Sequence, residues 1–376
     1  MIKATPGSIV LYALLILSAV VFLMQGMIRG VFLNNQSTSI ALARQQAEQL
    51  AWAGVQCAIV QLTVGSEADE LDEDSKGAAN ASGDEKKQDP AAQQKAMLKR
   101  VLPHLGRWQT FTLRKKHDLL DGEIKFCVVS EHGKLNINRI FDFQKMEFKK
   151  PYSDLVAGLE VPPLLKRGEL LERLVEFFKK RKKPLYDVSE LLTVPGLQTL
   201  EIFYVPPPAP EKGKPAVANQ SVALLDLFTV WTDQELVSPL WLSDGLRCIL
   251  GLRRPHADDA EKQQEAFKKT LHLLKPEAGQ DWDANWQVLE PVYGPKPKAI
   301  TALKNNFAKE FGSTVYSVLS CGKVDEVECQ LLVILKEQNV GKKAAKTSPE
   351  KMADKAKSDP DDQPKKVLRP IRVYWL

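Results

Sequence analysis

A long uncharged stretch near the start of the chain dominates the hydrophobic pattern. Residues 8–28 carry no charge, and Arg29 ends the run. About 20 predominantly apolar residues in a helix are enough to cross a bilayer. The pattern therefore predicts one membrane-spanning helix over 8–28. The short leader 1–7 holds a single basic residue, Lys3, which favours a cytoplasmic leader and an external position for the bulk of the chain.

The apolar pattern continues at helical spacing beyond the predicted membrane span. Polar residues between Arg44 and Gln49 interrupt a stripe of small and apolar side chains, formed by Ser37, Ile40, Ala41, Ala43, Ala47, Leu50, Ala51, Gly54, Val55 and Ala58. A cleaved secretory signal would end in a small-x-small site, and 25–30 fits that pattern poorly. We therefore expect one long helix with an amphipathic continuation over 29–62.

Alternation of apolar and polar residues farther along the chain predicts strands. In 123–130, the side chains of Ile124, Phe126 and Val128 fall on one face, as in a half-buried strand. Similar alternation occurs in 108–113, 312–321, 328–336 and 371–376. A small antiparallel sheet packed on the long helix would bury these faces, so we expect an α+β fold. The segment 371–376 is expected to be a terminal edge strand.

A different part of the chain has helical periodicity. Residues 164–180 place an apolar stripe on one helix face, formed by Leu164, Leu165, Leu170, Leu171, Leu174, Val175 and Phe178. After it, Ser189 can cap a second helix, which includes Glu190 and stops before a turn at Pro195 and Gly196. A further helix is expected over 91–105. These patterns predict an all-helical domain inserted into the α+β domain.

Several segments show no apolar periodicity. Residues 65–90 and 338–364 are rich in charged and small residues, a composition that cannot build a core. Residues 205–219 are rich in proline and lysine and are expected to form an extended linker. The expected organisation is a leader 1–7, a membrane span 8–28, an amphipathic helix 29–62, a flexible loop 65–90, an α+β domain formed by 91–150 and 221–336, an inserted helical domain 151–205 whose extension into 240–310 stays open, an insertion 338–364 and a terminal strand 365–376.

Composition narrows the class of protein only slightly. The 376 residues are 44% hydrophobic and 26% charged, as in globular proteins. A formal charge of +5 results from 52 basic and 47 acidic residues, a near balance that does not argue for nucleic acid. The basic run 179–183 would suit phosphate, but cations at a helix C-terminus are also favoured by the helix dipole alone.

The cysteines and histidines suggest no metal centre. No CxxC pair or Cys/His spacing typical of zinc occurs. Cys321 and Cys329 flank a predicted hairpin turn, where facing strand positions would bring the two sulfur atoms within bridging distance. Two interpretations stay open, a disulfide or two small buried thiols. Metalloprotease, hydrolase and nucleotide-binding motifs are absent and the five histidines are scattered, so we expect a protein that is not an enzyme.

The N-terminal layout resembles that of type IV pilins and pseudopilins. A short basic leader ends at Gly7, and the apolar helix then begins at Ser8. The resemblance implies that a prepilin peptidase cuts after Gly7, that the new N-terminus is methylated, and that the apolar helix is an assembly element. The assembly surface is expected to include Tyr12, Leu14, Leu15 and Leu17. Family members usually carry a glutamate at the fifth mature position, where this chain has Tyr12.

That departure matches one branch of the family, the minor pseudopilin K subunit of type II secretion, which also lacks this carboxylate. Three further runs resemble that subunit: Leu135-Asn136-Ile137-Asn138, Ser189-Glu190-Leu191 with Val194-Pro195-Gly196, and Phe228-Thr229-Val230. The resemblance implies a non-enzymatic subunit at the tip of a periplasmic pseudopilus, held in the bacterial inner membrane by a single span. It implies other minor pseudopilins and the inner-membrane secretion platform as partners.

Two further interpretations stay open at this point. The turn at Pro195 and Gly196 is similar to a helix-hairpin-helix module, which presents backbone amides to DNA phosphate, and 179–183 would add charge. A membrane-anchored DNA-binding protein is therefore the alternative function.

The resemblance to K subunits would also allow calcium, and acids cluster by a turn at Asp118, Asp121 and Glu123, although spacing alone does not assign ligands. The two asparagines Asn136 and Asn138 are expected to cap turns.

Overall fold

The computed structural model describes residues 6–63, 101, 104–158, 168–197, 223–252, 282–295, 307–308, 313–340 and 365–376. Within these ranges the side chains of 6–13, 248, 282–285, 288, 339–340 and 365–366 are not described. The expectations for the loop 65–90 and the linker 205–219 fall outside the described residues. So do most of the helix expected over 91–105, the side chains Leu164 and Leu165, and residues 341–364 of the expected insertion.

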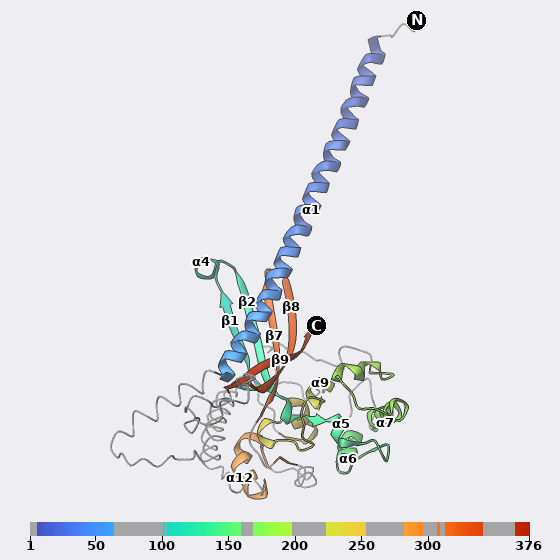
Figure 1. Cartoon of the computed structure of the whole chain (residues 1–376). Coiled ribbons are helices and arrows are strands. Elements are labelled where there is room, and N and C mark those ends of the chain that lie inside the picture. Colours follow the sequence, from blue (N-terminus) through green and yellow to red (C-terminus); the bar gives the residue numbers. More distant parts are fainter. Residues whose placement is uncertain are drawn as a thin grey trace, which may run out of the picture.

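The long N-terminal helix is continuous. Helix α1 runs from Pro6 to Thr63, over 58 residues, as the hydrophobic pattern predicts. Proline at its start is compatible with a helix because the first-turn amides have no intrahelical acceptor. Figure 1 shows the first half of α1 standing away from the rest of the molecule and the second half lying on the sheet. Among the described residues, α1 is the one helix long and apolar enough to cross a membrane.

The five-stranded sheet is antiparallel throughout, as expected for an α+β fold. Its order is β1-β2-β7-β8-β9, and its strands are β1 (Trp108–Leu113), β2 (Gly122–Ser130), β7 (Val315–Val324), β8 (Val327–Val340) and β9 (Lys365–Trp375). The terminal strand lies at the sheet edge, as predicted. Strand β8 extends to Val340, so the insertion expected from 338 begins later than the sequence suggests.

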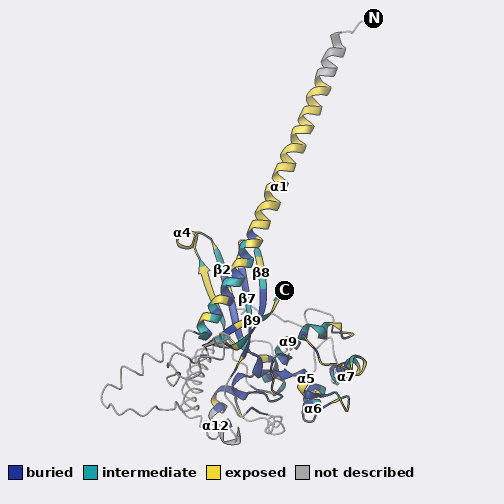
Figure 2. Ribbon diagram, viewed as in Figure 1, coloured by how far each residue is buried: buried dark blue, intermediate teal, exposed yellow. Residues whose placement is uncertain are grey.

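The second half of α1 packs across β2, β7 and β8. Small side chains make the close approach feasible, since Ala47, Ala51 and Ala58 are completely buried. On the sheet, the predicted face of Ile124, Phe126 and Val128 is buried beneath the helix, together with Val318, Leu331 and Val333 from the neighbouring strands. Figure 2 shows this boundary on α1, where exposed residues give way to buried ones at the sheet.

The helical part of the molecule is inserted between two neighbouring strands. Strands β2 and β7 pair along their length, although residues 131–314 separate them in the sequence. The described part of this excursion contains η2 (Glu131–Gly133), β3 (Leu135–Asn136), α5 (Ile137–Ile140), β4 (Phe141–Asp142), β5 (Glu147–Phe148), α6 (Tyr152–Ala157), α7 (Glu169–Arg181), η3 (Val188–Thr193), α9 (Leu224–Leu227), β6 (Phe228–Thr229), η4 (Pro239–Trp241), α10 (Asp244–Ile249) and α12 (Trp282–Tyr293). A short helix α4 (Lys115–Asp118) lies in the β1–β2 turn.

Aromatic side chains form the centre of the helical module, which we define as α6, α7 and η3 with the β4–β5 hairpin. The ring of Phe178 from α7 stacks on Phe141 at a centroid distance of 4.5 Å, and Phe143 and Phe148 meet Phe178 edge-on. Helix α7 begins at Glu169, because Gly168 before it has a left-handed backbone, so the prediction of one unbroken helix from 164 is wrong at its start. Its residues Leu170, Leu174 and Phe178 are completely buried. The apolar stripe predicted for this helix therefore does face the core.

The prediction that Ser189 caps the second helix of this module is wrong. The helix is the 3₁₀ segment η3, and its N-cap is Asp187, whose carboxylate accepts from the amide of Ser189. Glu190 completes a capping box by accepting from the amide of Asp187. Asp and Ser both serve as N-caps, and the reciprocal bond from Glu at the third helical position selects Asp187 here.

Candidate functional site

The free half of α1, residues 14–42, carries most of the large apolar side chains that are exposed among the described residues. Leu14, Leu15 and Leu17, predicted as assembly residues, are about 60% exposed, at 62%, 58% and 63%. Every described side chain from 14 to 42 is exposed. Soluble monomers rarely leave a contiguous apolar surface of this length in water. It therefore requires lipid or other helices around it.

The apolar surface does not stop at the predicted membrane boundary. Beyond Arg29, the side chains of Val31, Phe32 and Leu33 are at least 60% exposed, and Ile40 and Leu42 are more than half exposed. The first carboxylate along the helix is Glu48. Gly7, Ser8 and Tyr12 lie within the helical backbone of α1, but their side chains are outside the described set. No Asp or Glu therefore precedes residue 48 in the sequence.

The second half of α1 packs very closely on the sheet. Gly322 of β7 lies so close to α1 that an added Cβ would be 2.1 Å from the carbonyl oxygen of Ala47 and 2.6 Å from the amide nitrogen of Ala51. Gly54 of α1 makes a similar approach, since a Cβ there would be 2.2 Å from Ser320 Oγ. Both glycines are therefore required for the spacing between helix and sheet.

The predicted hairpin turn is occupied by the protein's own side chains. Gly196 adopts a left-handed backbone with φ of +82°, and the guanidinium of Arg173 sits against it. Arg173 Nη1 donates to the carbonyl oxygen of Pro195 at 2.6 Å. Glu190 pairs with Arg181 at 2.5 Å, so one cation of the basic run is neutralised. The turn serves to pack α7 against η3, and these contacts give no support to the DNA-binding alternative.

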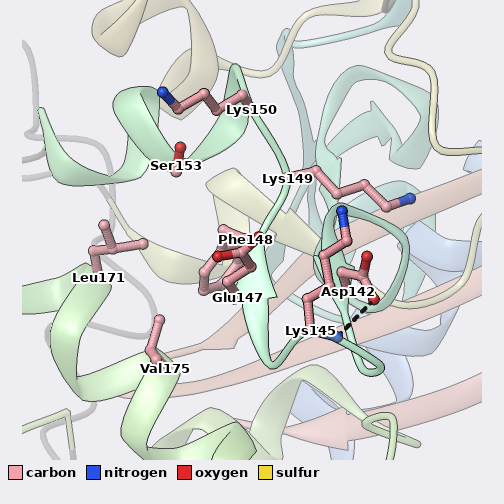
Figure 3. Close-up of a pocket in the computed structure, with 9 residues that line it drawn as sticks. All are labelled: Asp142, Lys145, Glu147, Phe148, Lys149, Lys150, Ser153, Leu171 and Val175. Carbon is pink, nitrogen blue, oxygen red and sulfur yellow. Dashed lines mark hydrogen bonds between the residues drawn. The ribbon is translucent and has the colours of Figure 1, made fainter.

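A cleft of about 480 Å³ opens in the helical module between the β4–β5 hairpin, α6 and α7 (Figure 3). It is lined by Asp142, Lys145, Glu147, Phe148, Lys149, Lys150, Ser153, Leu171 and Val175. Backbone amides of Lys145 and Gln144 donate to Asp142 and lower the pKa of its carboxyl. Lys149 pairs with Glu235 at 2.6 Å. Asp142 therefore stabilises the hairpin turn as a carboxylate, which makes it a structural acceptor and not a proton donor.

Each of the three acids considered for calcium has a hydrogen-bond or ion-pair partner within the protein. Asp118 accepts from the amide of Arg114 at 2.8 Å and Asp121 from the amide of Lys115 at 2.7 Å. Glu123 pairs with Lys125 at 3.1 Å. In the part of the chain that the structure describes, no group of three or more His, Cys, Asp or Glu side chains could hold a metal ion.

The two asparagines do more than the capping expected of them. Asn136 caps α5 by accepting from the amide of Asn138, and its side-chain amide also reaches the carbonyl oxygen of Thr232. Asn138 binds the backbone of Leu185 twice, accepting from its N–H at 2.7 Å and donating to its C=O at 2.8 Å. These long-range partners could not be found from local spacing, because they lie far away in the sequence.

The disulfide considered for Cys321 and Cys329 is wrong, since both thiols are free. The two-residue turn pairs Val324 with Val327, which places Cys329 opposite Gly322 and Cys321 opposite Gln330. Because neighbouring strand residues point to opposite faces, the two sulfur atoms lie on opposite sides of the sheet.

We therefore expect both thiols to be alkylated when the chain is unfolded without reductant. In the folded protein Cys321 should react slowly, because burial raises the pKa of its thiol to about 12 and leaves little thiolate at pH 8. Peptide mass spectrometry of the labelled chain checks this. Recovery of an unlabelled, disulfide-linked Cys321–Cys329 peptide would contradict the register of β7 and β8.

Comparison with known proteins adds a loose structural likeness. No protein-family model and no curated protein matches the chain. The chain is similar to one in "The Crystal Structure of the GspK-GspI-GspJ complex from enterotoxigenic Escherichia coli Type 2 Secretion System", at 12% identity and a TM-score of 0.31. The match covers 76% of this chain and 92% of that one. A likeness with a TM-score this low does not establish a shared function.

Proposed function

We propose that the chain is a minor pseudopilin, a non-enzymatic subunit at the tip of a periplasmic pseudopilus in type II protein secretion. The observation that carries this proposal is the division of α1 into two halves. The second half packs on the protein's own sheet, and the first half is an exposed apolar helix long enough to span a bilayer. A subunit that is anchored in a membrane and then packs helix against helix requires this division.

The free half supports single-pass insertion in the inner membrane, and Lys3 in the leader favours a periplasmic position for the bulk of the chain. Apolar residues at 31–33, 40 and 42 remain exposed beyond the 8–28 span. Assembly with other minor pseudopilins would cover them, and burying each such side chain contributes about 1.5–3 kcal/mol. The secretion platform in the inner membrane would be the second partner of this helix.

The absence of a carboxylate at position 12 of α1 supports the tip position. In the pilin resemblance, a carboxylate at the fifth mature position neutralises the terminal amine of a neighbouring subunit. This chain has Tyr12 at that position. Its first Asp or Glu is Glu48, so no carboxylate lies in the membrane-spanning part of the helix. A subunit with nothing above it does not need that carboxylate. The helical module lies at the end of the molecule away from the membrane span (Figure 1), where a tip subunit would present it.

Photo-crosslinking in cells tests the proposal. A photoreactive residue at Ile40, on α1 outside the span, should capture other pilin-like chains, and should not capture a second copy of this chain. The matched control is Leu119, which is 89% exposed but lies beside α4, and it should capture fewer of those chains. Capture of this chain by itself would contradict the tip position, and capture of no pilin-like chain would contradict assembly.

A further inference from the structure

The edge strand β9 presents different residues on its two faces. Val373 lies opposite Val333 and Trp375 opposite Leu331, whose side chains are buried beneath α1. Because strand side chains alternate, Arg372 and Tyr374 point to the other face of the sheet. This is the face that meets the helical module. Strand β9 is therefore in a position to touch the module while it pairs with β8.

Asp187 is where the strand and the module meet. Tyr374 Oη donates to Asp187 Oδ2 at 2.5 Å, and Arg372 Nε lies 3.7 Å from the same oxygen. The Arg372 guanidinium also lies 5.8 Å from the ring centroid of Trp231. The other oxygen, Asp187 Oδ1, accepts from the amide of Ser189 and caps η3. One carboxylate therefore serves both the cap of η3 and the contact with β9.

The partly buried surroundings favour the hydrogen bond between Tyr374 and Asp187. Asp187 is only 17% exposed. Burial and the neighbouring carboxylate raise the pKa of the Tyr374 hydroxyl, so the hydroxyl stays protonated and able to donate at neutral pH. Hydrogen bonds to a charged acceptor are the stronger class in proteins.

The segment around Asp187 is also held from other directions. Asn138 of α5 binds both backbone groups of Leu185, and Glu190 pairs with Arg181 of α7. Asn138, Arg181 and Tyr374 are far apart in the sequence, yet all three reach the short stretch 185–190. Tyr374 and Arg372 join this stretch to the sheet, Arg181 holds it within the helical module, and Asn138 connects it to α5.

We propose that β9 is a strap that fixes the helical module on the sheet, and that Asp187 is the positioning residue through which the strap acts. The order of η3 and the pairing of β9 are then coupled, so loosening either one loosens the other. This proposal concerns the fold alone and does not depend on the proposed function.

Hydrogen exchange on the full chain in detergent micelles tests the coupling. Tyr374→Phe removes one hydroxyl and leaves the cap of η3 intact, so a purely local role predicts no change in η3. The strap predicts that the amides of 188–194 exchange about tenfold faster, the loss expected for a hydrogen bond to a charged group. Amides of β2 and β7 should be unaffected. The control is Tyr186→Phe, whose ring is 73% exposed, and it should change nothing.

The reverse experiment uses Asp187→Asn, which keeps an oxygen acceptor for the Ser189 amide but removes the charge that Tyr374 and Arg372 bind. Coupling is reciprocal, so amides in 371–375 should exchange faster in this variant. If Tyr374→Phe accelerates exchange only within β9, or if exchange rises equally across the whole sheet, β9 is not a strap. Unchanged exchange in β9 for Asp187→Asn would also overturn the proposal.

Discussion

Leu17→Arg is expected to lower membrane insertion of the chain by at least about 100-fold. Leu17 lies near the middle of 8–28 and is 63% exposed on the free half of α1. An arginine at the centre of a membrane helix costs about 2.5–3.5 kcal/mol on the insertion scale, and the favourable contribution of leucine is lost as well. The sum is about 3–4 kcal/mol, which corresponds to a change of at least roughly 100-fold in the insertion equilibrium.

The share of the chain that resists carbonate extraction from membranes measures this effect. The matched control is Thr38→Arg, an exposed position on the same helix but beyond the span, which should extract like the unmodified chain. If Leu17→Arg is as membrane-bound as Thr38→Arg, α1 is not the anchor.

Gly322→Ala is expected to destabilise the domain by about 3 kcal/mol, near the upper end of the range for overpacking a closely packed core. The new methyl group would meet backbone atoms of α1, the carbonyl oxygen of Ala47 at 2.1 Å and the amide nitrogen of Ala51 at 2.6 Å. A flexible side chain could swing aside, but helix backbone cannot, so the whole of α1 must move away from β7. The contacts of Phe126 and Val318 beneath the helix would loosen as a consequence.

Chemical denaturation in detergent, followed by tryptophan fluorescence, measures the loss. Gly30→Ala is the matched control, because nothing lies within 4 Å of a Cβ at that position. It should leave the denaturation midpoint unchanged. Equal midpoints for the two variants would mean that α1 does not pack on β7 at the distance described.

The elements that repeat a hydrophobic pattern were predictable from the sequence. The stripe that includes Ala47, Ala51 and Ala58 predicts both the length of α1 and the face it buries, because helical periodicity is a local property. The alternation at Ile124, Phe126 and Val128 predicts β2 for the same reason. Burial of Leu170, Leu174 and Phe178 follows from their spacing in α7.

Features that depend on register or on distant partners were not predictable. The turn between Val324 and Val327 sets the pairing of β7 with β8, and a shift of one residue decides whether Cys321 can face Cys329. The choice of Asp187 over Ser189 as a cap depends on where the helix begins, which sequence patterns locate poorly. The contact between Tyr374 and Asp187 joins residues 187 positions apart, and local sequence patterns do not predict a contact over that separation.

The most direct test of the proposed function is the N-terminal residue of the protein extracted from bacterial membranes, determined by mass spectrometry of the intact chain. A minor pseudopilin processed by prepilin peptidase should begin at Ser8 with a methylated amine, and Gly7→Ala should instead retain Met1. An unmodified chain that still begins at Met1, or one cut after residue 28, would contradict the assignment of α1 as a pseudopilin assembly helix.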